Sequence, residues 1–162
     1  MSADNIKVMN GLDSPSRSGL YKDVWFWLML GLGPLTSWAL FQLMGGTKVS
    51  GLPLEQWKNL MWLVLLFPVI EEWLFRGLLQ RQLLKTRFGC PTVFGLSGAN
   101  GITSIVFATA HLLSQPSEWV ALVIVPSLIF GWFRDRYESI LPSVILHSSY
   151  NLGYFFIFGL LV

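Results

Sequence analysis

Five long apolar runs constrain this chain more than any other feature, and most of the charges lie in the polar tail before them and in the short connections between them. About 20 predominantly apolar residues in a helix are needed to cross the hydrocarbon core of a bilayer. The runs therefore predict an all-α fold, a polytopic transmembrane helix bundle of about five spans. We expect these spans at residues 24–44, 57–79, 93–113, 118–133 and 140–161.

The composition also indicates an integral membrane protein. Hydrophobic residues make up 53% of the 162 residues and charged residues only 12%, about half the charged fraction of a typical soluble domain. A net charge of +2 gives no indication of nucleic-acid binding. We therefore expect the lipid bilayer as a partner and no nucleic acid. Residues 1–23 are polar and are expected to form a cytoplasmic tail, before a single transmembrane domain at 24–162.

The positive charges predict the orientation, because cytoplasmic connections of membrane proteins carry an excess of Lys and Arg. Eight Lys and Arg residues fall in the amino-terminal tail and in the connections at 80–92 and 134–139, whereas Lys48 and Lys58 lie on the opposite side. The amino terminus and these two connections should therefore be cytoplasmic.

A few polar residues interrupt the apolar runs, where they are costly unless they pair, face a cavity or take part in chemistry. Residues in an α-helix turn by about 100° each, so Glu72 and Arg76 share a face in the favourable order for an ion pair. Glu71 points about 140° away from Arg76 on the same geometry, and we expect its carboxylate to be free. The same spacing of four relates Phe107 to His111 and His147 to Asn151.

The depths of these residues predict a single cluster. Glu71 follows roughly 14 residues of its span, at ~1.5 Å each, and so lies in the cytoplasmic half. His147 lies within about two turns of the cytoplasmic start of the last span, at a similar depth. His111 matches only if its helix begins near Asn100. We therefore expect 93–99 to be irregular or interfacial chain, and the cluster to form from three helices.

Other interpretations of these residues stay open. Glu72 and Arg76 would serve equally as a buried pair that fixes the position of a helix. A cluster of Glu and His would also suit the proton relay of a carrier. Ser148 and Ser149 point about 100° or more from His147, which argues against a serine nucleophile.

The three polar motifs resemble those of the CPBP (CAAX-processing and bacteriocin-processing) family of intramembrane proteases, which includes the type II CAAX prenyl endopeptidases. The motifs are Glu71-Glu72-x-x-x-Arg76, Phe107-x-x-x-His111 and His147-x-x-x-Asn151, in this order and each in an apolar segment. The similarity extends over about 60–155. It implies a small prokaryotic member, integral to the plasma membrane, that cleaves a membrane-embedded or lipid-anchored peptide. That substrate would be CAAX-like, a carboxyl-terminal sorting tail or bacteriocin-related.

The resemblance further implies a glutamate protease without a cofactor. Glu71, with help from His111, would activate a water that attacks the scissile carbonyl directly. His147 and Asn151 would donate hydrogen bonds to the developing oxyanion. The shape of the site would be held by Glu72, Arg76 and Phe107.

Two alternatives remain beside this mechanism. The first is a zinc-dependent version of the same protease, because one carboxylate and two imidazoles form a usual set of catalytic zinc ligands. That set would be Glu71, His111 and His147, from three separate helices and without an HExxH motif. The second is a non-catalytic membrane protein that binds peptides, such as an immunity protein.

Overall fold

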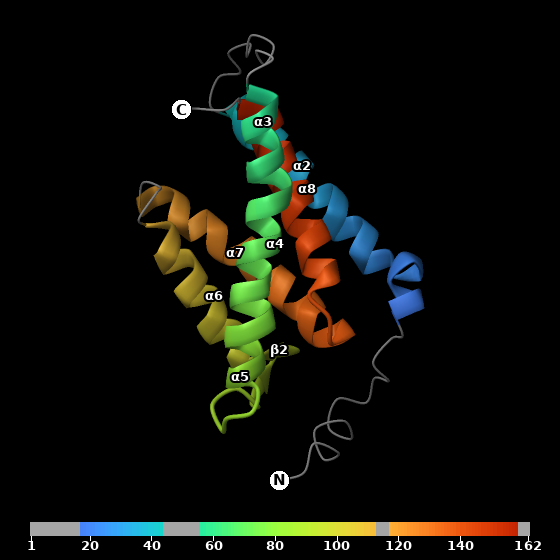
Figure 1. Ribbon diagram of the computed structural model, residues 1–162, viewed down its shortest axis with the longest axis vertical. Helices are drawn as coiled ribbons and strands as arrows, with labels where there is room; N and C mark the ends of the chain where they lie inside the picture. Colours follow the sequence, from blue (N-terminus) through green and yellow to red (C-terminus); the bar gives the residue numbers. More distant parts are fainter. Residues whose placement is uncertain (1–16, 44–55, 113–116, 159–162) are drawn as a thin grey trace.

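The computed structural model describes residues 17–43, 56–112 and 117–158, which form a bundle of helices with one short hairpin (Figure 1). A 3-10 turn, η1 (Arg17–Lys22), leads into α2 (Val24–Leu43). A long helix follows, here called helix two, made of α3 (Gln56–Met61), η2 (Trp62–Leu66), α4 (Phe67–Glu72), η3 (Trp73–Gln80) and α5 (Arg81–Leu83). Its segments η2 and η3 are π-helical. The remaining elements are β1 (Thr92–Val93), β2 (Leu96–Ser97), α6 (Gly98–His111), α7 (Ser117–Tyr137) and α8 (Leu141–Phe158).

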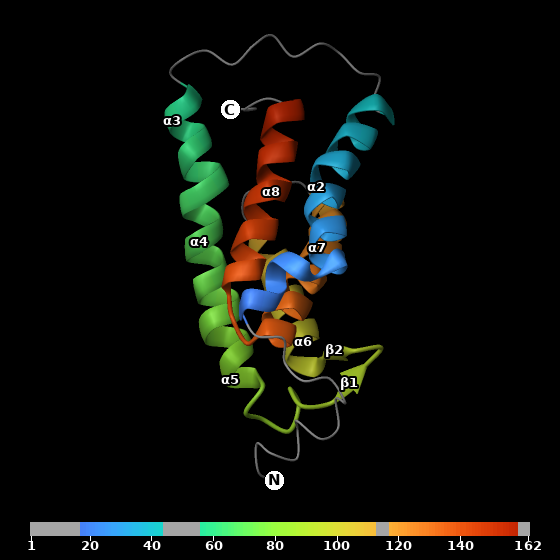
Figure 2. The ribbon, with the colours of Figure 1, turned by 90° about the vertical axis from the view of Figure 1, so that its right-hand side faces the viewer.

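Helix α8 lies at the centre of the bundle. It packs along α2, α7 and helix two, while α6 packs along α7. Figure 2 shows α8 between helix two and α2. A Cβ atom at Gly153 would lie 2.6 Å from Pro34 Cα, so α8 and α2 meet backbone to backbone. An apolar core between α2, α7 and α8 includes Leu20, Phe26, Phe130, Phe133, Tyr137 and Leu146.

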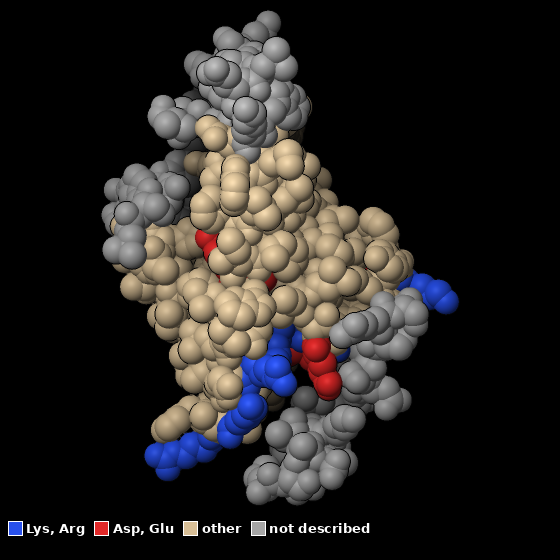
Figure 3. Space-filling model, viewed as in Figure 1, with Lys and Arg blue, Asp and Glu red and all other residues tan. Residues whose placement is uncertain are grey.

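The distribution of polarity is inverted relative to that of a soluble protein. Glu72, Arg76, Gln80 and Asn100 are each 0% exposed. Large apolar side chains face outward instead, among them Trp25, Trp38, Trp62, Phe67 and Trp73. Figure 3 shows most of the visible charged side chains in the lower part of the view, while the surface above them is almost free of charge. Such an exterior suits a lipid environment, in which backbone polar groups are satisfied within helices.

Each of the five predicted segments coincides with a helical region. Within the described residues, α2 is the one helix whose own length and composition suffice to cross a membrane. That the other four segments also cross stays a prediction. Helix α7 continues to Tyr137, past the expected end at 133. The prediction for the tail concerns mostly residues 1–16, which lie outside the described part.

The start of the third segment agrees closely with the prediction. Helix α6 begins at Gly98, and Ser97 caps it by accepting a hydrogen bond from the Asn100 amide at 3.0 Å. The chain before it is an antiparallel hairpin of β1 and β2, which was not predicted. Phe94 and Gly95 at its tip have φ values of 52° and 77°, as a tight two-residue turn requires.

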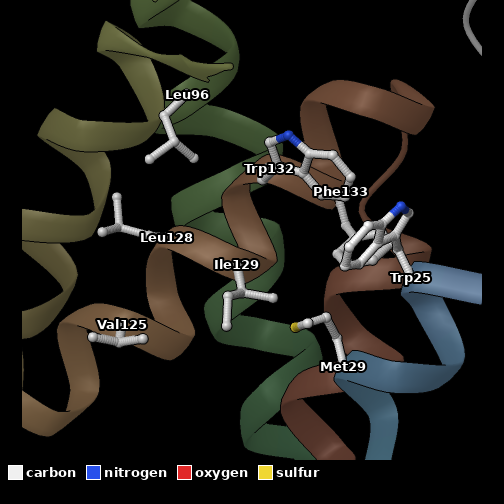
Figure 4. Close-up of a pocket in the computed structure, with 8 residues that line it drawn as sticks. All are labelled: Trp25, Met29, Leu96, Val125, Leu128, Ile129, Trp132 and Phe133. Carbon is white, nitrogen blue, oxygen red and sulfur yellow. The ribbon is translucent and has the colours of Figure 1, made fainter. Parts of the chain in front are cut away.

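An apolar cavity of about 230 Å³ lies between α2, α7 and the hairpin (Figure 4). Side chains from these elements point into it, and none of the predicted site residues is among them. The lining consists of Trp25, Met29, Leu96, Val125, Leu128, Ile129, Trp132 and Phe133.

Candidate active site

Helix two buries every fourth residue along most of its length. In an ideal α-helix a spacing of four drifts by about 40° per step, so five steps would carry such a stripe about half-way round the helix. The π-helical turns of η2 and η3 are wider, because their hydrogen bonds run from i to i+5, and they offset this drift. One face of helix two therefore stays directed into the bundle. Its buried residues are Leu60, Val64, Pro68, Glu72, Arg76 and Gln80.

The predicted ion pair between Glu72 and Arg76 is confirmed. Arg76 Nε lies 3.3 Å from Glu72 Oε2, and both side chains are 0% exposed. Arg76 Nη2 also donates to Ser127 on α7, to its carbonyl oxygen at 2.9 Å and to its hydroxyl at 2.8 Å. A buried charge needs a partner and further hydrogen bonds, and Ser127 supplies the latter. The pair thus joins helix two to α7.

His147 meets both glutamates, one at each ring nitrogen. Its Nδ1 lies 2.9 Å from Glu72 Oε1, and its Nε2 lies 3.6 Å from Glu71 Oε2. Because a carboxylate oxygen accepts, Nδ1 carries the proton of the shorter contact. The expectation that Glu71 is free is therefore wrong, since it faces His147. The two carboxylates still differ in exposure, because the Glu71 side chain is 31% exposed and that of Glu72 is 0%.

Phe107 connects the three motifs physically. Its ring centroid lies 4.5 Å from that of His111, 5.8 Å from that of His147 and 4.9 Å from that of Phe75. The Arg76 guanidinium carbon lies 4.9 Å from the same centroid. His111 Nδ1 donates to the Phe107 carbonyl at 3.0 Å, so a neutral His111 ring has its Nε2 unprotonated. Phe107 thus brings residues of helix two, α6 and α8 into contact.

Asn151 has a partner in the backbone of helix two. Its Nδ2 donates to the Leu63 carbonyl oxygen at 2.9 Å. The Phe67 amide bonds to the Trp62 carbonyl in the wide turn of η2, and Pro68 has no N–H to offer. The Leu63 carbonyl is thereby left for a side chain to satisfy. The role of Asn151 as an oxyanion donor stays a prediction.

The ligand set of the zinc alternative is not gathered in this arrangement. Among residues 17–43, 56–112 and 117–158, no three His, Cys, Asp or Glu side chains are grouped as a metal would require.

A second buried polar group, missed by the sequence reasoning, lies next to the first. Gln80 Nε2 donates to the Gly131 carbonyl at 3.0 Å and to Asp135 Oδ1 at 2.8 Å. The Ser97 hydroxyl donates to Asp135 Oδ2 at 2.6 Å. One signal was present in the sequence, because Gln80 follows Arg76 at the same spacing of four that relates Arg76 to Glu72.

Comparisons with known proteins agree with this geometry at the level of the family. A search of curated proteins and a search of solved structures each returned no match. A family model, described as type II CAAX prenyl endopeptidase Rce1-like, matches residues 53–153. This range is more than half of the chain and includes all three polar motifs. The chain therefore belongs to the Rce1-like family of type II CAAX prenyl endopeptidases.

Proposed function

We propose that the protein is an intramembrane endopeptidase in which Glu71 activates the hydrolytic water. The observation that carries this proposal is the difference between two adjacent carboxylates. Glu72 is fully buried between Arg76 and His147. Glu71 is 31% exposed and contacts Nε2 of His147. Glu71 is thus the carboxylate of this pair that both water and a substrate can reach.

In the proposed reaction Glu71 accepts a proton as the water oxygen attacks the scissile carbonyl carbon. His111 assists in orienting the water. The tetrahedral intermediate then collapses, the C–N bond breaks, and the proton passes from Glu71 to the leaving amine. Positioned general bases contribute roughly 10²–10⁴-fold to such reactions. No acyl-enzyme forms, since the attacking oxygen comes from water.

His147 is suited to stabilise the oxyanion when both its nitrogens are protonated. Glu72 accepts the hydrogen bond from Nδ1 of His147 and so fixes the orientation of the imidazole ring. Phe130 stacks on this ring, with the two centroids 5.1 Å apart. The Nε2 proton is then available to the developing negative charge. Such preorganised donors act most strongly where water is excluded. The second N–H of Asn151 is our candidate for a further donor.

The proposed substrate is a membrane-associated peptide, CAAX-like, a carboxyl-terminal sorting tail or bacteriocin-related, in the plasma membrane of a prokaryotic cell. An apolar hollow of about 410 Å³ lies on helix two and would accept an apolar part of such a substrate. Phe75 lines it and also contacts Phe107. The other lining residues are Leu74, Leu78, Leu79 and Gln82.

The test compares Glu71→Gln and Glu72→Gln in the purified full chain, with prenylated CAAX peptides and unlipidated tail peptides as substrates. We expect Glu71→Gln to lower kcat at least 100-fold without loss of thermal stability. Glu72→Gln should instead destabilise the fold by about 3–5 kcal/mol, because it leaves Arg76 buried without its counter-charge. Equal activity of wild type and Glu71→Gln would exclude the proposed role of Glu71.

A chelator distinguishes the two enzymatic mechanisms. Activity that survives chelation supports direct activation of water by Glu71, and activity lost on chelation supports the zinc alternative. Saturable peptide binding without hydrolysis would instead favour the non-catalytic protein.

A further inference from the structure

Glu72 Oε2 and Arg76 Nε face each other as an ion pair, and three further buried polar atoms beside them have no hydrogen-bond partner within the described part of the chain. They are Arg76 Nη1, Gln80 Oε1 and Thr103 Oγ1, and each belongs to a side chain that is 0% exposed. Both N–H groups of Gln80 are already used by Gly131 and Asp135, so its orphaned atom is the acceptor. Leaving a charged donor and an amide acceptor without partners in such a place is costly.

Packing brings the three groups to the same seam between η3, α6 and α7. At one end Arg76 contacts Phe107 of α6. At the other end Gln80 and Asn100 of α6 meet at Gly131, whose Cβ would lie 3.0 Å from Gln80 Oε1 and 1.9 Å from Asn100 Oδ1. Thr103 stands between Asn100 and Phe107 on α6, one turn from each. It is therefore level with the interval between Arg76 and Gln80.

The Thr103 hydroxyl differs from those of the other described threonines within α-helices. Thr36 donates to the Gly33 carbonyl at 2.9 Å, and Thr109 donates to the Ile105 carbonyl at 2.8 Å. Returning the hydroxyl to its own helix is the usual solution for a threonine in such a position. Thr103 does not adopt it, and its hydroxyl remains for another group in the seam.

We propose that this seam binds a buried water, held by Arg76 Nη1, Gln80 Oε1 and Thr103 Oγ1, and that this site supplies water to the active site. One water would accept a hydrogen bond from the Arg76 guanidinium and donate one to the Gln80 amide oxygen. Its third hydrogen bond would be with the Thr103 hydroxyl, which can donate or accept. Buried waters typically make about three hydrogen bonds of this kind. The supply role rests on the proposed hydrolytic function, whereas the binding of water does not.

The seam also has a polar entrance. Gln80 is bonded to Asp135, whose side chain is 22% exposed, and Ser97 donates to the other oxygen of Asp135. Asp135 follows Arg134, which is 11% exposed and pairs with it at 3.0 Å. A line of hydrogen-bonding groups thus runs from a partly exposed carboxylate to Arg76, beside Glu72. Such a line would give the active site a source of water on its buried side, in addition to the partly exposed side on which Glu71 lies.

The first test is diffraction from crystals of the full chain grown in a lipidic phase. Density for a water within hydrogen-bonding distance of all three atoms is expected in the wild type and in Thr103→Ser, and should be lost in Thr103→Val. Thr109→Val makes the same change on α6 where the hydroxyl bonds its own helix, and it should keep the water. A direct bond between Arg76 and Gln80 side chains, without water density, would overturn the proposal.

The second test measures hydrolysis at saturating substrate. Thr103→Val should lower kcat about fivefold, the worth of one hydrogen bond, with KM unchanged, while Thr103→Ser and Thr109→Val behave like the wild type. An unchanged kcat in Thr103→Val would overturn the supply role. A wild type without activity toward any peptide would contradict the proposed function instead, and the diffraction experiment would still decide whether the water site exists.

Discussion

Asn151 and Pro68 are complementary at the scale of single residues, because one satisfies a carbonyl that the other leaves without a donor. Asn151→Leu should therefore lower the free energy of unfolding by about 1–3 kcal/mol, the cost of a buried unsatisfied group. Thermal unfolding of the purified protein measures this loss. A role in oxyanion binding alone would leave stability unchanged.

A double-mutant cycle separates this bond from other effects of the substitution. Pro68→Ala introduces a backbone N–H that either bonds Leu63 in the wide turn or lets η2 relax, so that the Phe67 amide bonds Leu63. Asn151→Leu should then cost less in the Pro68→Ala background than in the wild type. Strict additivity of the two changes would show that the Leu63 carbonyl does not couple them.

The spacing of residues within a helix could be predicted, whereas contacts between helices could not. The Glu72–Arg76 pair follows from a separation of four in one helix, and the structure confirms it. That His147 contacts both glutamates depends on how far α8 approaches helix two, and the sequence does not contain this distance. Gln80 was overlooked because a neutral amide at the end of an apolar run looks like an ordinary boundary residue.

At the scale of elements, Gly131 determines how closely α7 can approach its neighbours. An added Cβ would lie 1.9 Å from Asn100 Oδ1, so Gly131→Ala should push α6 and α7 apart and destabilise the protein by about 1–3 kcal/mol. The control is Gly101→Ala on α6, where a Cβ meets nothing within 4 Å. Alanine there favours the helix by up to about 1 kcal/mol. Equal stability of the two variants would contradict this account of the interface.

The elements that the sequence did not predict are those in which local geometry departs from the commonest type. The wide turns of η2 and η3 were not expected, since the prediction assumed about 100° per residue throughout. The hairpin before α6 was missed because its turn places Phe94 at positive φ, where Asn or Gly is usual. The start of α6 was nearly right, because the depth of His111 and the Gly- and Ser-rich segment both constrained it.

At the scale of the whole molecule, Asp23 joins the beginning of α2 to the end of α7. It accepts hydrogen bonds from the Trp25 amide at 3.0 Å and from the Tyr137 hydroxyl at 2.7 Å, and it pairs with Arg136 at 3.0 Å. Burial alone would raise the pKa of Asp23, but the hydrogen bonds from Tyr137 and Trp25 and the charge of Arg136 lower it below 3.8. Burial and the bond to Asp23 raise the pKa of Tyr137 above 10.0.

These directions define the pH range in which the connection stabilises the bundle. A lowered carboxyl pKa stabilises the fold above the unfolded value, and this contribution is lost as the pH falls through the folded value. A raised tyrosine pKa stabilises the fold below about 10, and this contribution is lost at higher pH. Asp23→Asn should therefore cost about 1–2 kcal/mol at neutral pH, and the difference from the wild type should shrink below pH 3.8.

Thermal unfolding of both proteins across this range provides the measurement, with Tyr137→Phe as a second variant that removes the hydroxyl alone. Its difference from the wild type should shrink above pH 10. A difference that is independent of pH for both variants would show that the connection contributes nothing through these groups.

The general architecture was the most predictable level, because it follows from where charges and apolar runs fall along the chain. All five apolar segments became helical regions, and the charged connections lie at one end of the bundle (Figure 3). Which helices contact one another was not predictable, since α8 lies at the centre although its sequence resembles the other apolar segments. The arrangement of buried groups such as Ser127 and Thr103 depends on that packing.

The buried residues of helix two recur at every fourth position, so the number of residues between any two of them determines the angle between their side chains around the helix. Deleting one residue from Trp62–Leu66 would turn an i+5 turn into an ordinary one and rotate Leu60, with all that precedes it, by about 100° relative to Glu72. A deletion in Trp73–Gln80 would instead rotate Gln80 away from Asp135 and leave Glu72 in place. The orientation of each end of helix two relative to the glutamates is thus set separately, by η2 on one side and by η3 on the other. In each case, one residue more or fewer changes the orientation.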